Sequence, residues 1–134
     1  MAVRGRTAGA ACCALVLMGP ATVGADMPAG KPLLPPAVHG VWAYEPADCD
    51  VPDSDGLLTI EARSVEFFAS AYDLRRATRL SNGTVRASGL RSDEGEEGRT
   101  RSGLTLRLLT PDRLLVIANS PGGHVYHRCG QGRR

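Results

Sequence analysis

Carboxylates crowd one short segment, and their density makes this segment the strongest candidate for metal chemistry in the sequence. Four aspartates lie within eight residues: Asp48, Asp50, Asp53 and Asp55. Calcium takes roughly six to eight oxygen ligands, so weak calcium binding is one interpretation. With Gly56 at the sixth position of an EF-hand loop, however, Val51 and Ala62 would occupy its first and twelfth positions, where neither can ligate as that loop requires. We therefore interpret the segment as a solvated acidic loop.

Histidines are the next candidate ligands. His124 and His127 are three residues apart in a segment expected to be a strand, so their side chains should point to opposite faces. His39 could approach His124 if the first and last strands pair. Zinc is usually held by three or four ligands, and the sequence does not bring that many together. We predict no metal site and no cofactor.

Candidate catalytic groups are equally sparse. Glu94, Glu96 and Glu97 could serve as acid and base, but consecutive glutamates beside glycines are typical of a solvated loop. None of the serines lies in a GxSxG or SxxK context. We therefore predict no catalytic residue. A small hydrolase whose site assembles in space is kept as an alternative, because such a site need not show in sequence order.

Two aromatic residues are the candidate ligand-binding residues. Trp42 and Tyr44 are separated by one position in an expected strand, so they share a face. They could plug one end of the core, or they could line a pocket for an apolar ligand. The second interpretation makes both candidate binding residues.

The cysteines indicate a disulfide and an exported protein. Residues 1–25 have the basic start, the apolar stretch and the small-residue cleavage site of a secretory signal, which would remove Cys12 and Cys13. The remaining pair, Cys49 and Cys129, is predicted to form one disulfide in an oxidising compartment. We expect a periplasmic or extracellular location and no stable membrane insertion after cleavage.

Charge argues against one class of partner. The signal contains Arg4 and Arg6 but no acidic residue, so its removal takes the formal net charge from +2 to zero. A neutral domain lacks the broad positive field expected of a nucleic-acid binder, so we predict no nucleic-acid partner. Arginine outnumbers lysine fifteen to one, a bias associated with GC-rich bacterial genomes.

Alternating apolar residues and turn signals predict an all-β fold. Residues 26–38 contain four prolines and are expected to be a flexible linker, residues 39–129 a single β domain, and residues 130–134 a frayed tail. About eight strands are expected, with one from Ser64 to Ser70 and a type I′ hairpin turn at Asn82-Gly83. Short connections favour an antiparallel meander that closes, or nearly closes, into a barrel, with a two-sheet sandwich as the alternative.

Several segments together resemble a group of known proteins. They are Gly40-Val41-Trp42-Ala43, Cys49, Phe67-Phe68, the acidic turn at Gly95, Leu104-Thr105-Leu106, Arg113-Leu114-Leu115 and Tyr126-His127-Arg128-Cys129. This arrangement, over about residues 39–129, is similar to small secreted bacterial β proteins of uncharacterised function. The resemblance implies a disulfide-linked β fold and supplies no activity.

These observations leave three functional hypotheses. The first is a non-enzymatic exported binding module, such as an inhibitor of a periplasmic or extracellular hydrolase, whose partner would be an envelope protein. The second is a lipocalin-like carrier of a small apolar molecule, because an eight-stranded barrel is just wide enough for one small ligand. The third is the small hydrolase described above.

Overall fold

The computed structural model describes residues 30–118 and 121–130 and shows an all-β protein. Its eight strands are β1 (Gly40–Ala43), β2 (Leu57–Ile60), β3 (Ser64–Phe67), β4 (Ser70–Arg79), β5 (Val85–Asp93), β6 (Thr100–Thr110), β7 (Arg113–Ile117) and β8 (His124–Arg128). The expected signal peptide, residues 1–25, lies outside the described residues, as does most of the expected tail.

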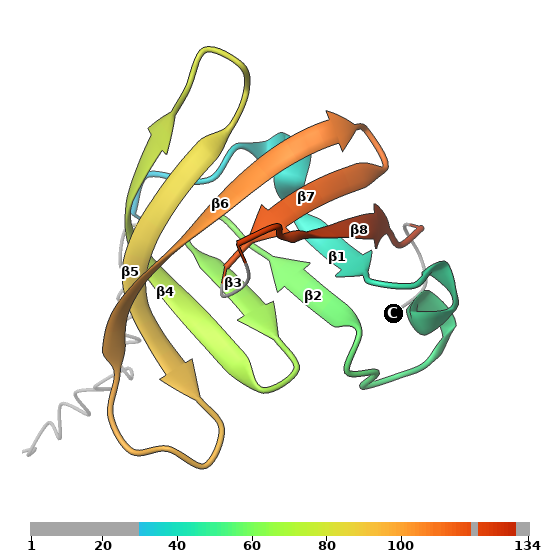
Figure 1. Cartoon of the computed structure of the whole chain (residues 1–134), viewed down its shortest axis with the longest axis horizontal. Helices are drawn as coiled ribbons and strands as arrows, with labels where there is room; N and C mark the ends of the chain where they lie inside the picture. The colour runs from blue at the N-terminus through green and yellow to red at the C-terminus, as the bar shows by residue number, and fades with distance from the viewer. Residues whose placement is uncertain (1–29, 119–120, 131–134) are drawn as a thin grey trace, which may run out of the picture.

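The strands form a closed antiparallel barrel in which each strand pairs with its neighbours in sequence (Figure 1). Closure is made by β1 and β8, where Trp42 lies opposite Arg128 and Ala43 opposite His127. The predicted meander and its closure are therefore confirmed, and the sandwich alternative is wrong. Closure pairs the first and last strands and leaves no exposed sheet edge between them.

Side chains alternate between inward and outward positions along each strand, and the inward ones fill the barrel. Inward-facing positions carry mostly aliphatic and aromatic residues, and the fully buried side chains with the largest volumes are Trp42, Tyr72, Leu34, Leu58, Ile60, Leu74, Leu106, Leu114 and Val65. The alternating leucines of β6 illustrate the rule, since Leu104 and Leu106 are buried whereas Arg107 is exposed. The core thus runs along the barrel axis.

The hairpin between β4 and β5 forms where the sequence predicts it, but with a different turn. Gly83 has a φ of 79°, whereas Asn82 does not have a positive φ, so a type I′ turn is excluded. The Gly83 N–H donates to the Leu80 carbonyl over 3.0 Å, and the Leu80 N–H donates to the Thr84 carbonyl over 2.8 Å. A single left-handed glycine suffices for this longer loop.

Strand lengths also differ from the prediction around the β3–β4 turn. β3 ends at Phe67, and Phe68 and Ala69 form the connection instead of continuing the strand. β5 extends to Asp93, directly before the glutamates that the sequence predicts to form a solvated loop. The reason is pairing, because Tyr72 lies opposite Arg91 and Ser70 opposite Asp93 in the ladder. Backbone pairing extends this strand through residues whose polarity suggested a loop.

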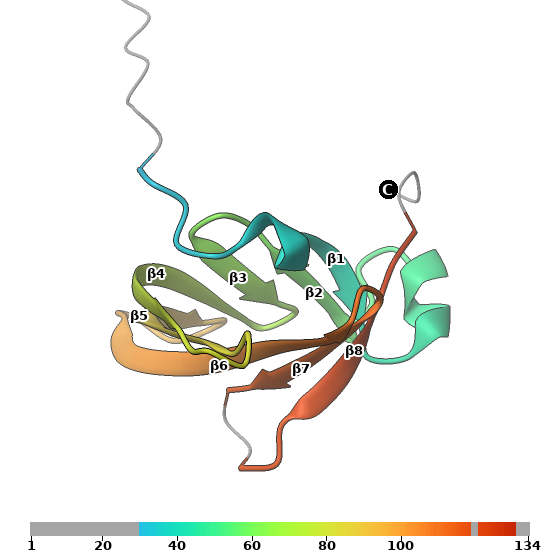
Figure 2. The ribbon, with the colours of Figure 1, turned by 90° about the horizontal axis from the view of Figure 1, so that it is seen from above.

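The segment before β1 lies against the barrel beside β1 to β3, including the short 3-10 helix η1 (Pro36–Val38) (Figure 2). Leu34 and Val38, in the second half of the expected linker, are buried in the core. The N–H groups of Leu33 and Leu34 both donate to the carbonyl of Ala62, in the β2–β3 turn. Residues 33–38, here called the N-terminal seal, therefore close the barrel end at which β2 ends and β3 begins.

The predicted disulfide is present. Cys49, in the 3-10 helix η2 (Pro46–Asp50), bonds to Cys129 just after β8, with 5.4 Å between the Cα atoms. The bond joins residues that are 80 positions apart and lies beside the β1–β8 seam. It is consistent with an oxidising compartment. Within residues 30–118 and 121–130, no helix is long and apolar enough to cross a membrane.

Candidate functional site

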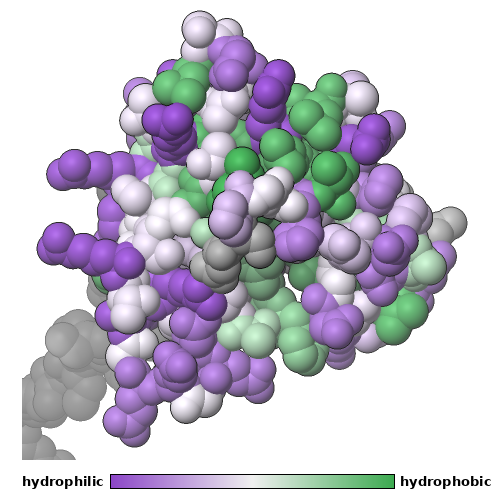
Figure 3. Space-filling view, in the orientation of Figure 1, coloured by the Kyte–Doolittle hydropathy of each residue, from purple (hydrophilic) through white to green (hydrophobic). Residues whose placement is uncertain are grey.

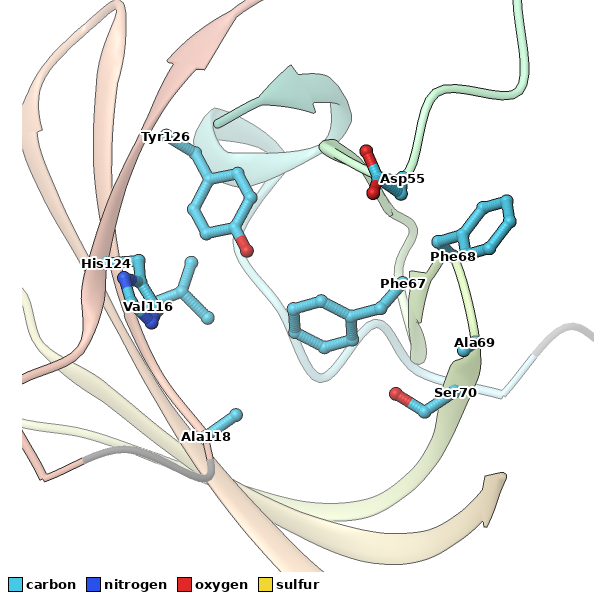
Figure 4. Close-up of a pocket in the computed structure, with 9 residues that line it drawn as sticks. All are labelled: Asp55, Phe67, Phe68, Ala69, Ser70, Val116, Ala118, His124 and Tyr126. Atoms are coloured by element: carbon cyan, nitrogen blue, oxygen red, sulfur yellow. The ribbon is translucent and has the colours of Figure 1, made fainter. Parts of the chain in front are cut away.

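A cavity of about 370 Å³ opens at the barrel end opposite the N-terminal seal (Figure 4). Its walls come from the β3–β4 turn, the end of β7 and the start of β8. The lining residues are Asp55, Phe67, Phe68, Ala69, Ser70, Val116, Ala118, His124 and Tyr126. The cavity is thus formed by segments that only barrel closure brings together.

Strand alternation explains which side chains face the cavity. Val116 and Ala118 are two positions apart and follow the inward face of β7, as Tyr126 does on β8, where it pairs with Leu114. Figure 4 shows the Phe67 ring and the Tyr126 hydroxyl directed into the space, with the Ser70 hydroxyl beside them. Phe68, by contrast, points away from the cavity. The wall is therefore mixed, with somewhat more apolar than polar surface.

Aromatic contacts hold the β8 side of the mouth. The Tyr44 ring meets His124 edge-on at a centroid distance of 5.5 Å and Tyr126 at 6.0 Å. Burial raises the pKa of Tyr126 above its usual value of 10.0, and the neighbouring Tyr44 adds to the effect. Tyr126 is therefore held in its neutral form, as a hydroxyl that can both donate and accept a hydrogen bond.

A polar cluster lies beside the aromatic wall, on the inward face of β4 and β5. The Arg91 guanidinium donates to Asp93 Oδ1 through Nε at 2.8 Å and through a terminal nitrogen at 2.5 Å. This hydrogen bonding to Asp93 raises the pKa of Arg91, burial opposes it, and a hydrogen bond with Tyr72 adds to the rise. Arg91 also lies 5.8 Å from the centroid of the Tyr72 ring. The pair carries no net charge.

The structure separates the two predicted ligand-binding residues. Trp42 is fully buried near the sealed end, where its Nε1–H donates to the Val38 carbonyl over 2.9 Å. Tyr44 lies at the open mouth and is 46% exposed. Neither is among the residues that line the cavity, although Tyr44 contacts two that are. Ligand binding by either residue stays a prediction.

The other candidate groups are placed as follows. His39 lies beside the N-terminal seal, with its Nε2 3.0 Å from the Leu34 carbonyl, and Arg128 rather than His124 is its neighbour from β8. Of the four aspartates in the acidic loop, Asp55 borders the cavity. Asp48 accepts a hydrogen bond from the Ser54 hydroxyl at 2.8 Å. Across the described residues, no three His, Cys, Asp or Glu side chains are grouped as a metal site requires.

A second hollow, of about 630 Å³, lies on the outside of β4 to β6 and is lined by Arg75, Arg76 and Arg101 among others. Figure 3 shows hydrophilic side chains projecting around β4 and β5, whereas apolar side chains gather over β6 to β8. Asp73 neutralises part of this arginine cluster, because its Oδ2 lies 2.8 Å from Arg75 and 3.6 Å from Arg99. The end cavity is smaller, but aromatic and aliphatic side chains line it where arginines line the outer hollow.

The fold and the cavity define a small closed meander barrel, sealed by its own chain at one end and open at the other. Comparisons with models of known protein families, with curated proteins and with solved structures found no match. The sequence alone missed Phe67, Ala118 and Tyr126 as cavity residues. Only the period-two pattern of their strands could have indicated that they face inward.

Proposed function

We propose that this protein binds one small, largely apolar molecule in the cavity at the open end of the barrel. The observation that carries the proposal is the cavity itself, which is about 370 Å³ in volume and is lined by aromatic, aliphatic and polar side chains. Ligand sites commonly measure roughly 300–1,000 Å³ and combine apolar walls with a few polar groups. An eight-stranded barrel is either filled by side chains or holds one small ligand, and in this barrel the space for a ligand lies at the open end, beyond the packed core.

The size of the cavity sets the affinity to expect. A two-ring hydrocarbon that buries roughly 250 Å² of apolar surface gains about 6 kcal/mol at ~25 cal/mol per Å². That gain corresponds to a dissociation constant of tens of micromolar, and the entropy lost on association weakens it further. Binding is therefore sought in the micromolar to millimolar range.

Export fits this role. The disulfide is consistent with an oxidising compartment, and a carrier in the periplasm or outside the cell would take its ligand directly from the surroundings. A binding role also fits a site that aromatic and aliphatic side chains from separate strands line together. The proposed partner is the small molecule.

A cavity-filling variant tests the proposal. Ala118→Phe adds a ring inside the cavity, whereas Ala47→Phe adds the same ring on the exposed surface of η2. Calorimetric titration with ethylnaphthalene should show binding to the wild type and to Ala47→Phe, and at least a tenfold loss of affinity in Ala118→Phe. Equal binding by all three proteins, or by none, would contradict the proposal.

One observation favours a protein partner as a second candidate. Phe68, in the β3–β4 connection, is 59% exposed and points away from the cavity. An exposed aromatic side chain on a short turn is suited to insertion into the cleft of a hydrolase, as an inhibitor would require. Crosslinking in living cells should then capture a hydrolase with the wild type and lose it with Phe68→Ala. Unchanged capture would exclude this role for Phe68.

A further inference from the structure

A β-bulge in β4 places two arginines side by side on the outer face of the barrel. Leu74 lies opposite Gly89 on β5, whereas Arg76 lies opposite Ser88, so Arg75 is an extra residue that the β5 register does not match. In a regular strand, consecutive side chains point to opposite faces. Here Arg75 and Arg76 are both exposed, and both line the outer hollow of about 630 Å³. The bulge therefore directs two cations to one space.

Glycines keep the surroundings of these arginines open. Gly89 lines the hollow, and a Cβ added there would collide with the carbonyl oxygen of Asp73 on β4, so only glycine fits beside the bulge. Gly103, on β6, lies opposite Ser88 and has no side chain to fill the face between the strands. Arg101 is two positions before Gly103, shares its face and lines the hollow as well. Arginines from two strands thus border a space that no large side chain occupies.

The positive charge of the outer hollow is only partly balanced. Its lining residues include Arg75, Arg76 and Arg101 and no acidic side chain. Asp73, which lies beside the hollow, pairs with Arg75 at 2.8 Å. Among residues 30–118 and 121–130, no carboxylate forms an ion pair with Arg76 or Arg101. Two positive charges are therefore left for an anion from solution.

We propose that the outer hollow binds a phosphate monoester group, with Arg76 and Arg101 as its charge partners and Ser88 as a further hydrogen-bond donor. A guanidinium presents a planar fork of N–H donors that matches the oxygens of a phosphate. A phosphate monoester carries a charge of about −1.5 to −2 at neutral pH, which matches the two unbalanced arginines. This site lies outside the barrel, so it is independent of the ligand proposed for the end cavity.

The distribution of charge favours a single phosphate group over a polyanion. Without residues 1–25 the chain has no formal net charge, so the hollow is a local positive site and not part of a broad positive field. Exposed ion pairs contribute little each, because water and salt screen them. We therefore expect dissociation constants in the millimolar range, and we expect binding to weaken as salt is added.

Amide NMR titrations with methyl phosphate and methyl sulfate test the proposal. The two probes have similar shapes, but the sulfate ester carries a single charge. The wild type should bind methyl phosphate with the largest shifts at Arg76, Ser88 and Arg101, and it should bind methyl sulfate about fivefold more weakly. The double variant Arg76→Gln, Arg101→Gln should lose about tenfold in affinity for methyl phosphate.

A second double variant controls for net charge. Arg79→Gln, Arg113→Gln removes the same two charges from exposed residues that do not line the hollow, and it should bind methyl phosphate as the wild type does. An equal loss in both double variants would overturn the inference, because net charge would then hold the anion. Wild-type affinity in Arg76→Gln, Arg101→Gln, or equal affinity of the wild type for the two probes, would also overturn it. None of these results bears on the end cavity.

A vesicle assay distinguishes the two sources of a phosphate monoester. The wild type is floated with phosphatidylcholine vesicles that contain or lack phosphatidic acid, whose headgroup is a phosphate monoester. Flotation that requires phosphatidic acid and is lost in Arg76→Gln, Arg101→Gln would assign the phosphate to a lipid headgroup. Binding of methyl phosphate without flotation would assign it to a soluble ester.

Discussion

The Arg128 guanidinium stacks on the indole of Trp42, with Cζ 4.1 Å from the ring centroid. Arg128 is on the last strand and Trp42 on the first, so this contact spans the seam that closes the barrel. The same guanidinium donates to the carbonyls of Pro111 at 2.9 Å, His39 at 3.0 Å and Ala37 at 2.5 Å. One side chain thus joins the seam, the β6–β7 turn and the N-terminal seal.

We expect Arg128→Ala to lower the free energy of unfolding by about 2–3 kcal/mol, because it removes three charge-assisted hydrogen bonds and a cation–π contact. Arg128→Lys should lose about half as much, since an ammonium cannot reproduce the planar fork. Urea unfolding followed by the fluorescence of Trp42, the only tryptophan in the chain, measures both. Losses below 0.5 kcal/mol in Arg128→Ala would show that the contacts are not stabilising.

The N-terminal seal can be tested by truncation. A chain starting at Pro32 keeps Leu34 and Val38 and should be as stable as one starting at Asp26. A chain starting at His39 should lose about 4 kcal/mol, because two buried aliphatic side chains and the acceptor of the Trp42 Nε1–H are removed. Urea midpoints of the three chains give the comparison. Equal stability of all three would contradict a sealing role for residues 33–38.

The fold was more accessible to sequence reasoning than the site. Alternating apolar residues indicated the β strands, and the pair of cysteines left outside the signal indicated the disulfide. The first signal is local, and the second follows from counting the cysteines. Leu34 and Val38 were not expected in the core, since a proline-rich stretch reveals its extended backbone but not what it packs against. Their burial at the sealed end depends on a barrel that forms from the rest of the chain.

For the polar cluster of Arg91 and Asp93, the sequence suggested solvent exposure, but the structure places both side chains on the inward face of β5. Arg91 and Asp93 have the polarity of a solvent-exposed segment, and the glycines and glutamates that follow reinforce that interpretation. Pairing with Tyr72 and Ser70 instead directs them toward the barrel interior. Phe67, Ala118 and Tyr126 come from three different segments, so their meeting at one cavity depends on long-range closure, which local patterns do not encode.

The disulfide should be a major source of stability. In the chain-entropy model, a cross-link between residues 80 positions apart constrains the unfolded chain by about 4.5 kcal/mol. We expect the double variant Cys49→Ala, Cys129→Ala to lose up to this amount in urea unfolding. The same loss should appear when the wild type is fully reduced. A loss under 1 kcal/mol would show that the barrel seam is stable without the bond.

Tyr126 should make the fold sensitive to alkaline pH. Its pKa is raised in the folded state, so its contribution to stability is complete below the unfolded value near 10 and is lost as the pH rises through the folded value. Tyr126→Phe should flatten the decline in stability above pH 10, measured by urea unfolding in steps of pH. Identical alkaline profiles for wild type and Tyr126→Phe would rule out this linkage.

The central claim is that the open end of the barrel is the ligand site, and mapping a bound probe by two-dimensional amide NMR tests it most directly. On titration with ethylnaphthalene, we predict that the largest shifts occur at Ala69, Ser70, Ala118 and Tyr126, and that Leu34 and Val38 at the sealed end stay unchanged. Shifts confined to the outer face of the barrel, or no shifts at millimolar probe, would contradict the account.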